Sequence, residues 1–502
     1  MAASKPKKIM PPKPGETFVR MYRQGLGDCF LLTFRGDNGQ AVHALIDCGV
    51  WDGDAATRKQ MKRVVEDIRV ATDDHLNLLA CTHEHWDHNS GFNQERATFE
   101  QMTIDNVWLA WTEDPKDDFA RQLKTEFEAK RNRLALALTR LSQADPQLGR
   151  RAAALAEVSG PFAAAAAAAG GADPAGAMKW VRDLDDRAAV GKPDAKVDCL
   201  YPGEVLPIPG AANAARAFVL GPPHDRPALN KNLPTKKQQE EGVVYHQTKH
   251  DRDAFGMMSL NPLADRAFFA AVEQHDKSRE HIAKLSGDEL EDYQLGLPFD
   301  LNLQKSKEAV RRLIPSYFDS KQKWRAIDAD WLSTAANIAL WMDKSTNNTS
   351  LVLAIELLPA GKVLLMAADA QVGNWLSWSK VKFKPPHKNV TADSLLNRTV
   401  LYKVGHHGSH NATLRRDGLE KMTHEQLVAM IPVNRKSVEA KGWPMPFPPM
   451  YRALRQQTDG RVIRADEGIM PQLASTSAAV WKEFRGNVKT SDVYIQYRCR
   501  HT

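Results

Sequence analysis

The sequence lacks any apolar run of ~18 residues, the length that a membrane-spanning helix needs. We therefore expect no membrane span in this chain. Residues 1–15 are rich in lysine and proline and lack the apolar stretch of a secretory signal. We interpret them as a disordered basic tail, and we expect a cytoplasmic location.

Cysteine is scarce, odd in number and scattered, which excludes a disulfide framework. The five cysteines are Cys29, Cys48, Cys81, Cys199 and Cys499. This usage predicts buried free thiols in a reducing compartment. Cys48 and Cys81 lie close to the motifs described below, so they are either small fillers of the core or supports for a site.

The sequence lacks the motifs of several classes of binding protein. The sequence shows no zinc ribbon, helix-turn-helix, RNA-recognition pattern or solenoid repeat. The 502 residues are 43% hydrophobic, which indicates a globular chain with a large core. The net charge of +7 permits a phosphate-bearing partner such as DNA, RNA or a nucleotide, without proving one.

The most informative stretch is His83-Glu84-His85-Trp86-Asp87-His88, which directly follows the apolar run 76–81. Three imidazoles and a carboxylate crowd together at low cost only when a cation neutralises them. Imidazole nitrogen and carboxylate oxygen suit Zn²⁺, Mn²⁺ or Fe. His83 and His85 point to one side of a strand end, whereas Asp87 and His88 lie in the following turn. One loop can therefore begin two neighbouring metal sites.

Two later apolar strands also end in ligand-type residues. The run 363–368 ends at Asp369, and the run 401–405 ends at His406 and His407. A single aspartate after a strand is often only a turn former. Three such strand ends together are expected where strand tips converge on one metal centre.

This order of motifs resembles the metallo-β-lactamase superfamily, and more narrowly the hydrolase domain of ComEC-type competence proteins. The pieces that carry the resemblance are Gly25 to Phe30, Leu45 to Gly49, Thr82 to Gly91, Phe218 to Pro223, Asn347 to Leu353, Asp369, His406 to Ser409 and Arg464 to Gly468. They cover about half of the chain. The metal loop and His-His-Gly-Ser are specific, and the glycine and proline pieces are weak alone.

The resemblance implies a four-layer αβ/βα fold and a centre of two divalent ions, zinc or manganese. It assigns His83 and His85 to one ion, Asp87 and His88 to the other, and Asp369 to both. One of His406 and His407 completes the second ion, and the other acts on the oxyanion or the leaving group. Asp28 and Asp47 either orient the histidines or the nucleophile, or are turn aspartates.

Two positions depart from the family pattern. The strand after the metal loop ends at Trp111-Thr112-Glu113, where many members have a third histidine for the first ion. His224 is one candidate for the missing ligand. Near the C-terminus, Trp443 stands where the family often has a histidine, and it either stacks on a base or ring of the substrate or caps the core.

The segments between the motifs predict a core interrupted twice. The expected division is a tail (1–15), core (16–112), helical insertion (113–198), core (199–224), mostly helical insertion (225–345) and core (346–502). Apolar spacing predicts helices over 119–141 and 173–189, and further helices over 264–285 and 330–342. These insertions either pack on the core or form a partner or dimer surface.

Our leading hypothesis is a metal-dependent phosphodiesterase or nuclease in which Asp87, His406 and His407 carry the chemistry. Arg415 and Arg416 either grip a phosphate or begin an exposed helix. One alternative is a hydrolase of lactones, thioesters or amides on the same ions, which an apolar pocket without Arg or Lys would favour. Another is a metal-stabilised interaction module of a larger bacterial assembly.

Overall fold

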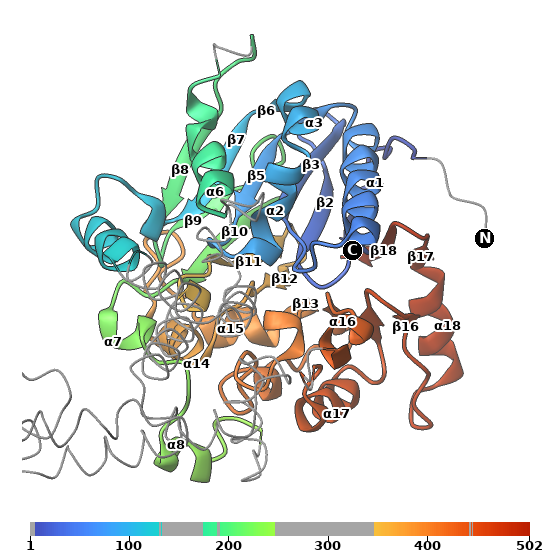
Figure 1. Ribbon diagram of the computed structural model, residues 1–502. Helices are drawn as coiled ribbons and strands as arrows, with labels where there is room; N and C mark the ends of the chain where they lie inside the picture. The colour runs from blue at the N-terminus through green and yellow to red at the C-terminus, as the bar shows by residue number, and fades with distance from the viewer. Residues whose placement is uncertain are drawn as a thin grey trace, which may run out of the picture.

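The computed structural model describes residues 6–129, 132, 174–187, 191–245, 346–440, 443 and 445–501. It confirms the α/β class: two eight-stranded mixed sheets are accompanied by helices (Figure 1). Two further short strands, β4 (His75–Leu76) and β6 (Thr103–Ile104), pair with each other. In this part of the chain, no helix has both the length and the apolarity needed to cross a bilayer.

The first sheet has the order β17-β18-β1-β2-β3-β5-β7-β8. From β17 to β3 in this order, each strand is antiparallel to the next. Strands β3, β5, β7 and β8 run parallel to one another. The bounds are β1 (Glu16–Tyr22), β2 (Cys29–Arg35), β3 (Ala41–Cys48), β5 (Leu78–Cys81), β7 (Asn106–Ala110), β8 (Lys196–Leu200), β17 (Val488–Thr490) and β18 (Tyr494–Arg500).

The second sheet has the order β16-β15-β14-β13-β12-β11-β10-β9. Strands β12 to β15 are parallel, so their carboxyl ends share one edge. The bounds are β9 (Val205–Pro207), β10 (Ala215–Gly221), β11 (Val352–Leu357), β12 (Lys362–Met366), β13 (Thr399–Lys403), β14 (Val428–Ile431), β15 (Val462–Arg464) and β16 (Gly468–Ile469).

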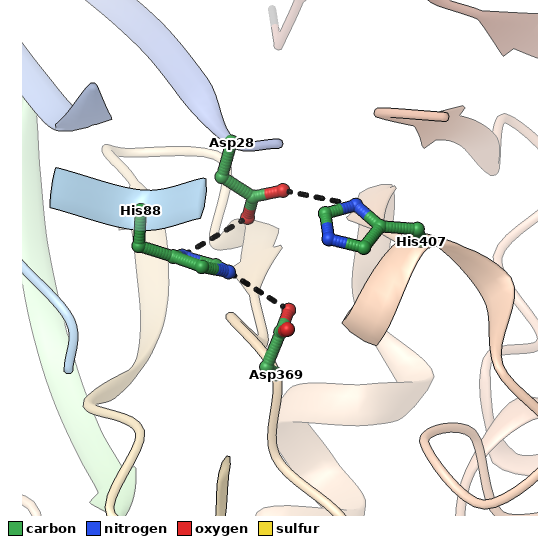
Figure 2. Close-up of side chains that lie close together, drawn as sticks. All are labelled: Asp28, His88, Asp369 and His407. Carbon is green, nitrogen blue, oxygen red and sulfur yellow. Dashed lines mark ion pairs between the residues drawn. The ribbon is translucent and has the colours of Figure 1, made fainter. Parts of the chain in front are cut away.

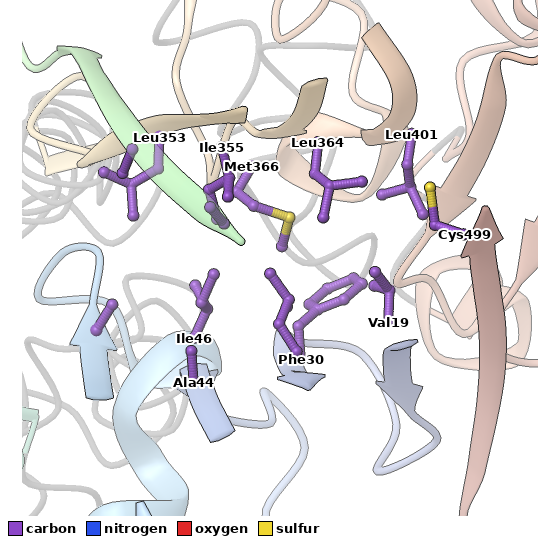
Figure 3. Close-up of a cluster of buried hydrophobic side chains, with 14 of the residues drawn as sticks. Val19, Phe30, Ala44, Ile46, Leu353, Ile355, Leu364, Met366, Leu401 and Cys499 are labelled. Atoms are coloured by element: carbon purple, nitrogen blue, oxygen red, sulfur yellow. The ribbon is translucent and has the colours of Figure 1, made fainter. Parts of the chain in front are cut away.

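The two sheets pack face to face through an apolar core (Figure 3). Phe30 and Ile46 of the first sheet and Leu353 and Leu364 of the second belong to this one cluster. Successive residues of a strand point to opposite faces. Because Leu31 and Leu45, the neighbours of those residues, are buried against helices instead, both faces of the first sheet are covered.

Helices cover the outer face of each sheet. On the first sheet lie α1 (Ala55–Ala71), α2 (Trp86–Gln94), α3 (Arg96–Gln101) and α6 (Pro174–Arg182). On the second lie α14 (Val372–Ser377), α15 (Ala392–Asn397), α16 (Arg435–Ala440) and α17 (Pro448–Gln457). Further helices include α7 (Arg226–Leu229), α8 (Lys236–Glu240) and α18 (Ala478–Gly486).

Local sequence explains several element ends. Asp54 caps α1, because its side chain accepts hydrogen bonds from the backbone N–H groups of Ala56 and Thr57. The apolar run 76–81 is split between β4 and β5. Trp111 lies in the short 3₁₀ turn η1 (Trp111–Glu113) rather than in β7.

The structure describes the predicted insertions only at their ends. In the first, residues 118–129 are helical and α6 falls within the helix predicted over 173–189. Strand β8 begins at Lys196, inside the range 113–198. In the second, α7 and α8 are described, whereas the helices predicted over 264–285 and 330–342 lie outside the described residues.

Candidate metal centre

The metal loop joins β5 to α2 at the carboxyl end of the first sheet. His83 and His85 follow the strand, and Asp87 and His88 lie in the first turn of α2. All four residues are buried, with exposed fractions of at most 4%. Gly49 packs directly under the loop, where a Cβ would lie 2.3 Å from the backbone nitrogen of His88. The loop is therefore held against the end of β3.

The first group of possible ligands contains His83, His85 and Asp369, whose ligand atoms all lie within 4.8 Å of one another. His83 Nε2 lies 3.1 Å from His85 Nδ1. The Thr82 hydroxyl donates to Asp47 and lies 3.0 Å from His83 Nδ1, so it accepts from that nitrogen. This fixes the His83 tautomer with its Nε2 lone pair toward the centre.

The second group contains Asp28, His88, Asp369 and His407, also within 4.8 Å (Figure 2). His88 Nε2 lies 3.2 Å from Asp369 Oδ1. Asp87 adjoins this group, since its Oδ2 lies 2.9 Å from His407 Nε2. Asp369 belongs to both groups, the position at which a carboxylate can bridge two ions.

Protein acceptors orient the imidazoles of the second group. His88 Nδ1 lies 2.7 Å from Asp47 Oδ2, and His407 Nδ1 donates to the Pro432 carbonyl at 2.8 Å. Each ring therefore directs its Nε2 toward the carboxylates of the centre. This is the usual arrangement behind a metal-binding histidine.

The structure distinguishes His406 from His407, whereas the sequence left open which of the two is a metal ligand. His407 is 3% exposed and belongs to the second group. His406 is half-buried at the rim, and its Nε2 lies 4.0 Å from Asp369 Oδ2. His407 is thus the better placed ligand of the two.

Backbone strain gathers at the strand ends that carry these side chains. Asp47, Ala368, His406 and His407 all have positive φ, between 45° and 56°. This left-handed region disfavours residues with a Cβ, and such outliers cluster at functional sites. The backbone N–H of His406, in one of these turns, donates to Asp369 Oδ1 at 3.0 Å.

Burial and neighbouring charges give His83, His85 and Asp87 the protonation states that metal ligands need. Burial lowers the pKa of His85 to about 4, and burial followed by the neighbouring imidazoles lowers that of His83 well below its ordinary value. Burial alone raises the pKa of Asp87, but the hydrogen bond from His407 and the charge of His88 outweigh it and bring it to about 2. Neutral imidazoles and ionised carboxylates are the forms that bind a cation. Burial lowers the pKa of His88 and His407, but the carboxylates beside them, chiefly Asp369 for His88 and Asp87 for His407, raise it above the ordinary value overall, so these two rings release a proton when a cation binds.

Two buried atoms of the centre support the fit to a cation. Asp87 Oδ1 has no hydrogen-bond partner among the described residues, and the group facing His88 Nε2 is the Asp369 carboxylate, 3.2 Å away. A buried polar atom without a partner is costly. Nitrogen and oxygen donors at this spacing suit zinc or manganese, and a divalent ion would satisfy both atoms.

Lys403, the last residue of β13, is a functional residue that the sequence analysis missed. Its ammonium forms an ion pair with Asp28 and lies 3.4 Å from Asp369 Oδ1. A signal was present, because a lysine in the apolar strand 399–403 is buried only if its charge is paired. Burial lowers the pKa of Lys403, but Asp28 and Asp369 raise it above its ordinary value overall.

The predicted substrate residues lie apart from the ligand groups found in the described chain. Arg415 pairs with Glu420 at 2.7 Å, and Arg416 donates to the Glu241 carbonyl at 3.1 Å. Trp443 contacts Trp51 edge to face, with ring centroids 5.4 Å apart. Arg415 thus stabilises its own surface loop, whereas Arg416 connects that loop to the end of α8, and their part in phosphate binding stays a prediction.

The position of the missing third histidine holds an ion pair instead. Glu113, in η1, is buried and binds Arg182 and Lys124. His224, the suggested substitute, lies 2.9 Å from Asp117 and packs on Trp111 with centroids 4.2 Å apart. Neither residue belongs to the two ligand groups of the described residues.

Comparison of the chain with protein-family models finds no match, and comparison with curated proteins finds none either. The residues of the centre and their surroundings therefore carry the functional interpretation.

Proposed function

We propose that this chain is a metal-dependent phosphodiesterase or nuclease with the αβ/βα fold of the metallo-β-lactamase superfamily, in its ComEC-type branch. The observation that carries the proposal is the sharing of Asp369 between the His83/His85 group and the His88/His407 group. Two face-to-face sheets with helices outside are consistent with that fold.

The residues have separable tasks in this proposal. His83 and His85 would hold one divalent ion, Asp87, His88 and His407 would hold the other, and Asp369 is within reach of both positions. Divalent ions bound there would supply an acidified water and a Lewis acid for the scissile oxygen. Asp47 fixes the His88 ring, and the Pro432 carbonyl fixes the His407 ring.

His406 is the candidate for handling the leaving group. It is half-buried beside Asp369, so it can reach both the centre and an incoming substrate. Burial lowers its pKa, which keeps the ring neutral and able to donate one N–H near neutral pH. Such a neutral ring can stabilise a developing oxyanion on the leaving group through that N–H.

The net charge of the chain, +7, favours a phosphodiester over an acyl substrate. A cavity of about 620 Å³ begins beside Pro432, at Val433, and its wall includes Arg23, Arg435 and Lys436. Four acids, Glu439, Asp466, Glu467 and Asp492, also line this cavity and outnumber its three bases, so its charge does not itself attract a phosphate.

Cleavage of end-labelled single- and double-stranded DNA, RNA and a cyclic dinucleotide, in Mn²⁺, Zn²⁺ or EDTA, tests the proposal. We expect metal-dependent cleavage that falls by more than about 100-fold in Asp87→Ala, since loss of a direct ligand should exceed the loss of a residue behind one. Asp105→Ala, which removes an exposed aspartate from His75, should retain activity. Folded, metal-loaded protein that cleaves none of these substrates contradicts the proposal.

A further inference from the structure

Lys403 is the most unusual charge in the described structure. Its side chain is 1% exposed and belongs to the largest fully buried side chains. Strand β13 lies between two parallel neighbours, β12 and β14, so the lysine cannot reach solvent along an edge. A buried ammonium is tolerated only where partners compensate for its lost hydration.

Its three partners all lie at the metal centre. The ammonium pairs with Asp28 Oδ2, donates to the Ala368 carbonyl at 2.7 Å and lies 3.4 Å from Asp369 Oδ1. Lys403 therefore places a fixed positive charge beside the carboxylate shared by both ligand groups. A cation at that position opposes the binding of a second cation to Asp369.

Asp28 is close enough to be a metal ligand, but its carboxylate faces the Nδ1 atoms of His88 and His407 rather than their Nε2 atoms. Its oxygens lie 3.7 Å from Nδ1 of His88 and 3.7 Å from Nδ1 of His407. Both Nδ1 atoms already face other acceptors, and the Nε2 atoms point elsewhere. Figure 2 shows Asp28 and Asp369 on opposite sides of the His88 ring. Lys403 engages the Asp28 oxygen that a metal ion would otherwise attract.

We propose that Lys403 is a positioning residue that holds Asp28 out of the coordination sphere and weakens metal binding, which keeps the bound ion exchangeable. This inference rests on the proposed metal centre. It assigns a direction to the effect of the lysine: removal of its charge tightens metal binding. A lysine with a merely structural role would have the opposite effect, because its loss would disorganise the ligands.

A double-mutant cycle on the full chain tests the inference. The dissociation constants of Zn²⁺ and Mn²⁺ are measured by competition with a chromophoric chelator, for the wild type, Lys403→Met, Asp28→Asn and the double variant. We expect binding to tighten by on the order of tenfold or more in Lys403→Met, since one buried positive charge is lost. It should weaken in Asp28→Asn and return close to the wild-type value in the double variant.

Circular dichroism shows whether Lys403→Met folds. If it does not fold, the double variant still tests the inference. The double variant leaves neither charge unpaired, and it should then bind metal more tightly than Asp28→Asn alone. Equal or weaker binding in the double variant, or weaker binding in folded Lys403→Met, overturns the inference. A wild type that binds no metal refutes the metal centre and this inference together. A wild type that binds metal but cleaves no phosphodiester refutes only the proposed activity.

Discussion

Three imidazoles of the candidate centre, those of His83, His88 and His407, have one nitrogen bonded to a supporting protein group and the other directed to the centre. Thr82 serves His83, Asp47 serves His88 and the Pro432 carbonyl serves His407. Asp47 is the common support, because it also accepts from the backbone N–H and the hydroxyl of Thr82. One buried carboxylate thus sets the orientation of two histidines, directly for His88 and through Thr82 for His83.

We therefore expect Asp47→Asn to weaken metal binding without removing any ligand. Supports behind metal-binding histidines contribute roughly 10- to 100-fold to affinity. A loss within that range, measured as a Zn²⁺ dissociation constant, is the expected result. The control is Asp105→Asn, which alters an aspartate–histidine pair at the surface. Asp105 Oδ2 lies 2.7 Å from His75 Nε2, and this substitution should leave the affinity for Zn²⁺ unchanged. Unchanged affinity in Asp47→Asn would show that Asp47 is only a turn aspartate.

At this scale the spacing of residues predicted the set that the structure brings together. His83, His85, His88, Asp369 and His407 share the two groups, with Asp87 beside them. Lys403 and the Pro432 carbonyl escaped notice, because their contact with the centre depends on how β13 and β14 pair. The spacing of residues in the sequence predicts which side chains lie near one another along the chain. It does not predict which buried charges come into contact when strands pair in a sheet.

Among the elements, the β2–β3 hairpin positions two of the carboxylates. The register pairs Cys29 with Cys48, so Asp28 and Asp47, which precede these cysteines, lie at the same end of the hairpin. At the other end, Thr33 pairs with His43, and the Thr33 hydroxyl lies 3.1 Å from His43 Nδ1. His43 is 4% exposed, so this end of the hairpin buries a neutral imidazole.

We expect His43 to make stability fall with acid between pH 6.5 and about 4. Burial, followed by the charge of Arg20, lowers its pKa from 6.5 to about 4 in the folded chain. In that window the unfolded chain binds a proton and the folded chain does not, so the contribution is full above 6.5 and is lost as pH falls. The shift corresponds to about 3 kcal/mol. Urea unfolding in EDTA, as a function of pH, measures it.

The matched variant is His43→Gln, which keeps a polar side chain of similar size but does not titrate. The difference in free energy of unfolding between wild type and variant should change across this window and stay constant above it. A difference that is independent of pH would mean that the His43 ring is solvated or protonated in the folded chain.

Elements with strong local signals were predicted, and those with weak signals were not. Helix α1 carries strong local signals, because Asp54 caps it and apolar residues recur on one face. Strands of three or four residues, such as β9 and β14, were missed. A segment that short shows no period, and its strand conformation comes from pairing with neighbours.

Across the whole molecule, the candidate centre joins the two sheets. Asp28 and the metal loop come from the first sheet, whereas Asp369 and His407 follow β12 and β13 of the second. Between the sheets lies the apolar cluster of Phe30, Ile46 and Leu364, which packs without any cation. A metal ion would therefore add a second connection between the sheets at the edge of an existing core.

We expect a bound metal to stabilise the entire fold, since its ligands separate when the sheets do. Binding to the folded state alone contributes about 2.7 kcal/mol at a free metal concentration of 100 times the dissociation constant. Mn²⁺ is the better probe, because the thiols and imidazoles of an unfolded chain bind Zn²⁺ more strongly. Urea unfolding in excess Mn²⁺ and in EDTA measures the gain, which should largely vanish in Asp369→Ala, because Asp369 belongs to both ligand groups, and persist in Asp105→Ala. An equal gain in Asp369→Ala would place the stabilising ion somewhere other than between the two sheets.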